Sequence, residues 1–268
     1  MSFSVVITTY NRADKVSDAI DSALTWVGDD SRCQVIVVDD CSTDETAEKL
    51  VSRYGTEMVT GRIRLVANSE NVGVSGAKNA GFRASSGDWV IFLDSDDVFQ
   101  PDNIREMMMV LERSRDVPIV FFRCVDQDGR FIGQLFESDM LIDLRTYLKH
   151  VSYGEALVCL NRRIVRNAPF FDELRGYEGL GCADIISRHG PALLSPVVGR
   201  IYNTMGPDRL SAVRGFMQRM TLVGKGHSLM LARFGSYMPV RLRAAYLLKS
   251  LVYWVVGHGY RIIVEGRV

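Results

Sequence analysis

Three carboxylates stand within four residues at Asp94, Asp96 and Asp97, directly after the apolar segment 89–93. Like charges this close repel one another by about 1 kcal/mol per pair even in water. A divalent cation such as Mg²⁺ or Mn²⁺ relieves that repulsion, taking one or two protein carboxylates and completing its shell with water and phosphate oxygens. The cluster therefore predicts a metal site suited to a diphosphate. The alternative is a solvated acidic turn, in which Asp97 caps the next helix.

A second acidic pair, Asp39-Asp40, follows the apolar segment 35–38. A carboxylate at the end of a strand can accept a hydrogen bond from the imide N–H of uracil or from a ribose hydroxyl. The same side chains could instead form an Asx turn and cap a helix beside Ser42. One carboxylate of the pair could serve each purpose.

The spacing of apolar residues places both acidic groups at the ends of buried strands. Short apolar segments typical of a helix-covered sheet occur at 4–8, 35–38, 63–67 and 89–93. Helical patterns lie between them, the first capped by Asn11, the second by a capping box at 42–45, and the third at 76–84. This alternation predicts a doubly wound α/β sheet with ligands at the carboxyl ends of its strands.

The pattern is less regular in the second half of the chain. A strand is expected at 118–123, and Asp128-Gly129 predicts a hairpin that joins it to a second strand at 131–136. Short helices and strands follow to about residue 200. After Gly215 the sequence is helical and basic to its end.

Charge is unevenly distributed along the 268 residues. The formal net charge is zero, which gives no indication of nucleic-acid binding. From Arg214 onward, however, nine Lys and Arg residues face the single acid Glu265, so this tail carries +8 and the preceding body −8. The tail also contains seven aromatic residues. It is expected either to contact an anionic membrane surface or to pack on the acidic body or a second subunit.

Cysteine usage and the start of the sequence bear on its compartment. Five widely spaced cysteines suggest reduced thiols, as in the cytoplasm. A strand is expected from Ser4, with no leader peptide before it. The longest apolar stretch, 244–256, is interrupted by Lys249 and is too short to span a bilayer. We therefore expect a cytoplasmic protein, either free or peripheral on the inner face of the membrane.

Four ordered motifs resemble the signature of family 2 glycosyltransferases with the GT-A fold. They are Val6-Ile7-Thr8-Thr9-Tyr10-Asn11-Arg12, Val38-Asp39-Asp40-Cys41-Ser42, Asn71-Val72-Gly73 with Ala77-Lys78-Asn79-Ala80-Gly81, and Asp94-Ser95-Asp96. The resemblance is strong to about residue 102, extends to about 205 and is absent from the tail. It implies a Rossmann-like, mostly parallel, doubly wound sheet flanked by helices, with a C-terminal helical extension.

The resemblance also implies roles for matching positions. Asp40 would read the base edge of a nucleotide, UDP for preference, and Asp96 would ligate Mn²⁺ or Mg²⁺. Lys78 stands where the family often has arginine. The implied nucleotide-sugar contacts are Thr8, Tyr10, Asn11, Arg12, Asp40, Asn71, Gly73, Lys78, Asp94 and Ser95. Residues 1–102 would form the donor-binding half, 103–213 the acceptor-binding and catalytic half, and 214–268 a basic helical extension.

The family's catalytic base usually lies in a Glu-Asp pair about ninety residues downstream. Here that region reads Ala183-Asp184, so Asp184 is the candidate base although the glutamate is missing. Asp172 and Glu178 remain alternatives. A base there implies a single displacement with inversion at the anomeric carbon.

The function expected from the sequence is transfer of a sugar from a nucleotide-diphosphate donor to a glycan or polyprenyl-linked acceptor, in bacterial surface polysaccharide assembly. One alternative is a glycan-binding or scaffolding protein that has lost catalysis, for which Ala183 argues. Another is a sugar nucleotidyltransferase, which would need a glycine-rich basic loop where this chain has residues 8–12.

Overall fold

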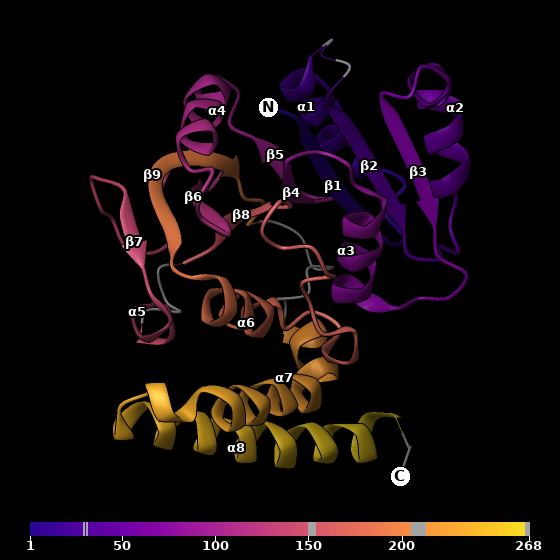
Figure 1. Ribbon diagram of the computed structural model, residues 1–268. Coiled ribbons are helices and arrows are strands. Elements are labelled where there is room, and N and C mark those ends of the chain that lie inside the picture. Colours follow the sequence, from indigo (N-terminus) through magenta and orange to yellow (C-terminus); the bar gives the residue numbers. More distant parts are fainter. Residues whose placement is uncertain (29, 31, 150–153, 205–212, 266–268) are drawn as a thin grey trace.

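The structure is a computed structural model, and it describes residues 1–28, 30, 32–149, 154–204 and 213–265. Its first half alternates strands and helices in the predicted order (Figure 1). The strands pair in parallel in the order β3-β2-β1-β4. The elements are β1 (Phe3–Thr9), α1 (Val16–Val27), β2 (Gln34–Asp39), α2 (Thr46–Val59), β3 (Ile63–Ala67), α3 (Gly73–Ala84) and β4 (Trp89–Asp94).

The same sheet continues into the second half, where it becomes mixed. Beyond β4 lie β8, antiparallel to it, then β6, antiparallel to β8, then β9, parallel to β6. Two short strands, β5 and β7, pair antiparallel with β9. The elements are β5 (Val98–Phe99), η1 (Pro101–Asn103), α4 (Ile104–Arg113), β6 (Ile119–Val125), β7 (Met140–Ile142), α5 (Leu144–Lys149), β8 (Ala156–Asn161), η2 (Asp172–Leu174), α6 (Glu178–His189) and β9 (Ala192–Ile201). The expected doubly wound fold is present, and one sheet runs through both proposed halves.

Alternate residues of each central strand face opposite sides of the sheet, so that among the described residues a hydrophobic core lies on each face. Val5 and Ile7 of β1 point into the core under α1 and α2. Val6, between them, points into the core shared with α3 and α6. A strand buried on both faces needs apolar residues throughout, which is why β1 and β2 lack the polar alternation of a half-exposed sheet.

Three local predictions were wrong. The turn at Asp128-Gly129 forms, with Gly129 at φ +78°, but residues 131–136 make only an isolated bridge to β6, because β8 and β9 occupy both of its edges. Asn11 does not cap α1, which begins at Val16; its side chain accepts a hydrogen bond from Thr43 N at 2.8 Å. The capping box at 42–45 is also absent, because α2 begins at Thr46 without a side-chain cap from Glu45.

Helix α3 lies unusually close to the sheet, and this closeness requires Gly81. A Cβ atom added there would overlap Val6 Cγ1 of β1 and lie 3.1 Å from Val38 Cγ2 of β2. Overpacking of this kind typically costs about 1–3 kcal/mol. We therefore expect Gly81→Ala to lower the free energy of unfolding by that amount in urea titrations.

Gly259 provides the matched comparison, since it is also helical but a Cβ atom added there would meet no atom within 4 Å outside its chain neighbours and the backbone of its own helix. Gly259→Ala should leave stability unchanged or raise it by up to about 1 kcal/mol, because alanine is the better helix former. Equal effects of the two substitutions would contradict the close packing of α3.

In the described residues 213–265, the basic tail forms two antiparallel helices at the end of the molecule remote from α1 and α2 (Figure 1). They are α7 (Val213–Phe234) and α8 (Val240–Glu265), joined through η3 (Gly235–Tyr237). The Tyr177 hydroxyl and His227 Nδ1 form a 2.8 Å hydrogen bond between α7 and the body. Burial lowers the pKa of His227, and the nearby positive charge of Lys249 lowers it further, to about 4. This contact is therefore uncharged near neutral pH. Within the described residues, no helix has the length and hydrophobicity needed to cross a membrane.

Candidate active site

A cleft of about 1060 Å³ opens at the carboxyl ends of β1, β2 and β4. Its volume is at the upper end for small-molecule sites, which gives room for a nucleotide and a second substrate. The parallel register sets Thr8 beside both Val38 and Asp94, so the loops after these three strands share one edge. Every donor and metal residue expected from the sequence lines this cleft: Thr8, Tyr10, Asn11, Arg12, Asp40, Asn71, Gly73, Lys78, Asp94, Ser95 and Asp96.

Lys78 occupies the centre of an ion-pair chain on one wall of the cleft. It comes from α3 and is 4% exposed, with Nζ 2.9 Å from Asp94 Oδ1 and 2.8 Å from Glu178 Oε1. Burial alone would lower the pKa of Lys78, but Asp94 and Glu178 outweigh it and raise the pKa. The lysine is therefore a fixed cation that joins the end of β4 to the start of α6.

Arg200 of β9 continues this chain and was not foreseen from the sequence. Its Nη1 atom lies 2.9 Å from Asp94 Oδ2 and 2.9 Å from Asp97 Oδ2, and the side chain is almost fully buried. Burial opposes ionisation of Asp94, yet Lys78 and Arg200 together lower its pKa to about 2. The sequence does contain a signal for Arg200, since an arginine inside the apolar segment 192–201 would be buried. A buried cation needs an anionic partner.

These contacts change the interpretation of the acidic cluster. Lys78 and Arg200 neutralise Asp94, and Asp97 is held by Arg200 and by the Asn203 N–H, which donates to Oδ1 at 2.8 Å. The carboxylate of Asp96 lies 3.7 Å from Arg12 Nη1, beyond direct hydrogen-bond distance, and faces the cleft. Repulsion within the cluster is thus relieved largely by protein cations, and Asp96 is the carboxylate placed to meet a ligand.

Asp96 offers the chemistry that a hard divalent cation prefers, an anionic oxygen at the mouth of a polar cleft. In the described part of the chain, no three His, Cys, Asp or Glu side chains are grouped into a ready-made metal cage. A cation here would therefore depend on water and ligand phosphates for most of its shell. That arrangement fits Mg²⁺ or Mn²⁺ better than a structural metal.

The carboxylates of Asp39 and Asp40 make different contacts. Asp39 Oδ1 accepts hydrogen bonds from Ser42 N at 3.2 Å and Ser42 Oγ at 2.5 Å, which closes an Asx-type turn. Asp40 lines the cleft and also anchors the loop before α3. Its Oδ1 accepts from Asn68 Nδ2 and Val72 N, and its Oδ2 from Gly73 N, at 2.8–3.0 Å. About one acceptor position of Asp40 is left for a nucleotide base.

Arg175 completes the loop that Asp40 anchors. It donates from Nη1 to Asn71 O at 3.0 Å and from Nη2 to Asn71 Oδ1. Gly73 has φ +78°, and a Cβ there would lie 2.9 Å from Arg175 Cβ, so only glycine fits without strain. Arg175 and Arg219 both line the cleft and add positive charge to its wall. Neither arginine belongs to the four motifs identified in the sequence.

The structure places Asp184 outside the cleft, apart from the other residues expected at the site. Its carboxylate pairs with Arg188 Nε at 2.7 Å and Arg233 Nη1 at 3.1 Å, and it is absent from the cleft lining. The reason is helical phase, since six residues along α6 place Asp184 about 240° round the axis from Glu178. Glu178, at the first position of α6, does line the cleft. Asp172 does not, and its Oδ1 accepts from Asn79 Nδ2 at 2.7 Å.

Next to this charged wall, the cleft has an apolar half. It is formed by side chains from β6, β7, β8, β9 and α5, namely Phe121, Ile142, Val158, Leu194 and Tyr147. Glu155, directly before β8, also lines the cleft, with its Oε2 atom 3.5 Å from Arg200 Nη2. Burial raises the pKa of Glu155. Arg200 opposes this rise and the neighbouring Asp94 adds to it, so that the pKa stays raised. The cleft can therefore hold a charged group against one wall and an apolar group against the other.

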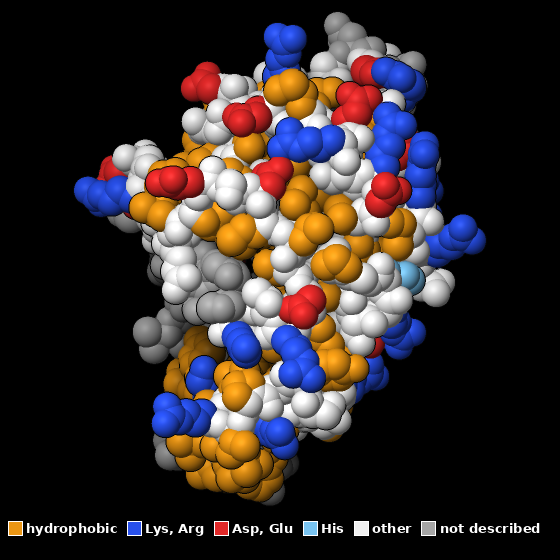
Figure 2. Space-filling model, turned by 60° about the vertical axis from the view of Figure 1, so that its left-hand side comes forward, with side chains coloured by type: hydrophobic (Ala, Val, Ile, Leu, Met, Phe, Trp, Pro, Cys, Tyr) orange, Lys and Arg blue, Asp and Glu red, His pale blue; other side chains and the backbone are white. Residues whose placement is uncertain are grey.

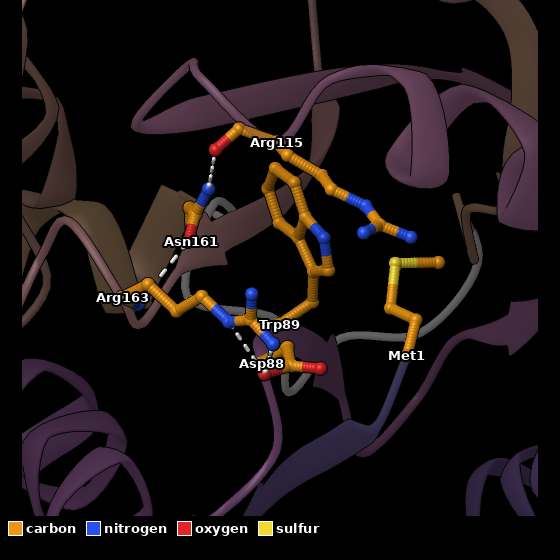
Figure 3. Close-up of a pocket in the computed structure, with 6 residues that line it drawn as sticks. All are labelled: Met1, Asp88, Trp89, Arg115, Asn161 and Arg163. Carbon is orange, nitrogen blue, oxygen red and sulfur yellow. Dashed lines mark hydrogen bonds and ion pairs between the residues drawn. The ribbon is translucent and has the colours of Figure 1, made fainter.

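A second hollow lies at the opposite, amino-terminal edge of the sheet, where β4 begins (Figure 3). Arg163 and Asp88 close one side with a 2.7 Å ion pair, and Trp89 and Met1 line the other. At about 50 Å³ it has room for a water or two but not for a nucleotide. It carries no candidate chemistry.

The sequence profile of glycosyl transferase family 2 matches residues 4–174. The succinoglycan biosynthesis protein ExoO of Rhizobium meliloti (strain 1021) is 30% identical over 213 residues, which cover 74% of this chain and 59% of that protein. The chain spans between half and two thirds of the length of the first three curated relatives it matches.

Solved structures share the fold at low sequence identity. Staphylococcus aureus TarS 1–349 in complex with UDP-GlcNAc superposes with a TM-score of 0.67 at 16% identity, covering 100% of this chain and 93% of that one. The mannosyltransferase PcManGT of Pyrobaculum calidifontis, in complex with GDP-Man and Mn²⁺, gives 0.65 at 18%, covering 99% and 75%. The architecture is therefore the GT-A fold, with the two C-terminal helices as an extension of it.

Proposed function

The chain belongs to glycosyl transferase family 2, and we propose that it transfers a sugar from a UDP-sugar to a hydroxyl group of a glycan or polyprenyl-linked acceptor, with inversion. The observation that carries the proposal is the gathering of Asp40, Lys78 and Asp96 around one cleft at the carboxyl edge of the sheet. The likeness to a protein named for succinoglycan biosynthesis supports a role in bacterial surface polysaccharide assembly.

Donor binding would use both the acidic and the basic residues of the cleft. Thr8, Tyr10 and the remaining acceptor position of Asp40 lie where a nucleoside would meet the ends of β1 and β2. Arg12 and Lys78 supply positive charge for the diphosphate. A Mg²⁺ or Mn²⁺ ion held at Asp96 would neutralise the charge that develops on the leaving diphosphate. UDP is favoured as the nucleotide by the TarS complex with UDP-GlcNAc.

Glu178 is the group we assign as base. It faces the same cleft as Asp94, on the far side of Lys78. The acceptor oxygen would form its bond to the anomeric carbon while the bond from that carbon to the diphosphate oxygen breaks. The hydroxyl proton would pass to the Glu178 carboxylate, and the electron pair of the broken bond would leave with UDP. Attack from the face opposite the leaving group gives inversion.

The acceptor is expected to extend into the apolar half of the cleft. Phe121, Ile142 and Leu194 offer no hydrogen bonds, so they suit a lipid stem or the apolar face of a sugar better than a second phosphate. A polyprenyl-linked glycan would present both features.

The first test is a thermal-shift screen of UDP, GDP and dTDP with and without Mn²⁺. We expect UDP with Mn²⁺ to raise Tm most, by roughly 5 °C at a hundred times its Kd. Asp96→Asn should remove the Mn²⁺-dependent part of the shift and keep any metal-independent part. Asp102→Asn, an exposed carboxylate on the following 3₁₀ turn, is the matched control and should change neither. Absence of any nucleotide-dependent shift in the unmodified protein would contradict the proposal.

A second candidate function is donor binding without transfer, as a glycan-binding or scaffolding protein. The observation favouring it is that Asp184 lies outside the cleft while the Glu178 carboxylate is already paired with Lys78. The two functions differ in their products. A donor-binding protein would show the same thermal shifts but release no UDP when offered UDP-sugars and oligosaccharide or polyprenyl-diphosphate acceptors.

A further inference from the structure

Among the side chains that the structure describes, helix α8 packs on α7 along one side. The residues that contact α7 on that side recur every three or four positions, as one face of a helix requires: Tyr246, Ser250, Tyr253 and Gly257. The approach is close, because a Cβ added at Gly257 would lie 2.8 Å from Thr221 Cγ2, and one at Gly224 would lie 3.1 Å from Ser250 O. The packed side of α8 is thus fully committed to α7.

The opposite side of α8 presents a stripe of large apolar residues. They follow one another at helical spacing, at i, i+1, i+4, i+7, i+8 and i+15. Their exposed fractions are 52–63%: Leu247, Leu248, Leu251, Trp254, Val255 and Ile262. We call these six residues the α8 stripe. Single exposed apolar residues need no explanation, but a continuous stripe of this size marks an interaction surface.

Cations accompany the stripe. Arg241, Arg243 and Lys249 are exposed on the same helix, and the sequence holds no Asp or Glu between residues 209 and 264. Figure 2 shows the tail as a hydrophobic end with Lys and Arg side chains beside it. An apolar strip edged by positive charge is complementary to the headgroup region of a bilayer that contains anionic lipids.

We propose that the α8 stripe inserts into the surface of an anionic lipid bilayer, with α8 lying in the plane of the membrane. Trp254 would sit at the headgroup level, where indole rings are enriched. A second copy of the chain fits the same surface less well, because pairing two such faces would bring Arg241, Arg243 and Lys249 of each copy together without a carboxylate between them. The proposal does not depend on the transfer reaction.

Membrane contact would also fix the distance between the active site and the bilayer surface. Phe216, Arg219 and Val223 of α7 line the cleft, and α7 is the layer that covers α8. The cleft would then lie about one helix-packing distance, 8–10 Å, above α8. A substrate embedded in the membrane by its lipid end could reach the cleft with its headgroup.

The test is flotation of the full chain with vesicles of phosphatidylcholine alone or with 30% phosphatidylglycerol, at low and high salt. We expect at least tenfold stronger binding to the anionic vesicles, lost as salt rises. Leu251→Glu combined with Val255→Glu should lower binding at least tenfold. Leu135→Glu with Leu141→Glu, exposed apolar residues away from the tail, is the matched control and should bind normally. Lys249→Gln should weaken anionic binding about fivefold.

A second measurement avoids charged substitutions and any loss of folding they cause. Tryptophan emission of the unmodified protein should shift to the blue on anionic vesicles, and Trp254→Phe should remove the shift while Trp26→Phe keeps it, since Trp26 is buried in the core. Equal flotation with neutral and anionic vesicles, or an unchanged Trp254 signal, would overturn the proposal. So would a lipid-free dimer, seen by analytical ultracentrifugation, that the Leu251 and Val255 substitutions dissociate.

Discussion

Glu178→Gln is expected to lower kcat by about a hundred- to ten-thousand-fold, the usual contribution of a general base. Glutamine keeps the size and the hydrogen-bonding oxygen that faces Lys78 but cannot accept the acceptor's proton. The Kd for UDP should change by less than about tenfold, because Asp40, Arg12 and Asp96 stay in place. Steady-state release of UDP with a suitable acceptor, together with UDP binding by calorimetry, separates the two effects.

Asp184→Asn is the matched comparison on the same helix. Its carboxylate faces Arg188 and Arg233 outside the cleft, so kcat should stay within about twofold of the unmodified value. A large loss of kcat in Asp184→Asn with normal turnover in Glu178→Gln would reverse the assignment. Normal turnover in both variants would direct attention to Glu155, another carboxylate that lines the cleft.

Asp184 shows where sequence reasoning reached its limit. The motifs after β1, β2 and β4 could be placed because each follows an apolar strand, and parallel strands deliver their carboxyl ends to one edge. Asp184 lies within a helix, where a residue's direction depends on which face of the helix packs against the body. The sequence alone does not show which face of α6 is directed at the cleft, and residues six positions apart, such as Glu178 and Asp184, point about 240° apart round the axis.

Non-local pairing explains the other misses. Asp128-Gly129 has the turn chemistry of a hairpin, but β6 pairs with β8 and β9, which come more than thirty and sixty residues later. Arg200 could be recognised as a buried cation in need of a partner, yet only the sheet order places β9 within reach of Asp94 and Asp97. Local patterns thus predicted the elements and the residues that line the cleft, whereas Arg200, the cation shared by Asp94 and Asp97, comes from a strand distant in sequence.

Arg200→Met is expected to lower the free energy of unfolding by about 3–5 kcal/mol, the typical effect of removing one partner of a buried ion pair. Arg200 is the cation that Asp94 and Asp97 share, and both would be left close together in a poorly solvated site. Burial already raises the pKa of Asp97 to about 7. Arg200 opposes this rise and Asp94 adds to it. Urea titration monitored by circular dichroism measures the loss, and Arg163→Met, which breaks the exposed pair with Asp88, should cost no more than about 1 kcal/mol.

The pH dependence of Arg200→Met distinguishes a charge effect from simple loss of packing. Without the guanidinium the pKa of Asp97 in the folded state should rise further, while in the unfolded chain it returns to its ordinary value near 4. Between these two values the folded state binds more protons than the unfolded one, so stability must fall as pH rises. Arg200→Met should therefore recover part of its stability at pH 5 relative to pH 8.

Adding Asp97→Asn to Arg200→Met should reduce both the loss of stability and its pH dependence, because the amide carries no charge and can still accept the hydrogen bond from Asn203 N. A loss independent of pH and unchanged in the double variant would mean that Arg200 acts by filling space.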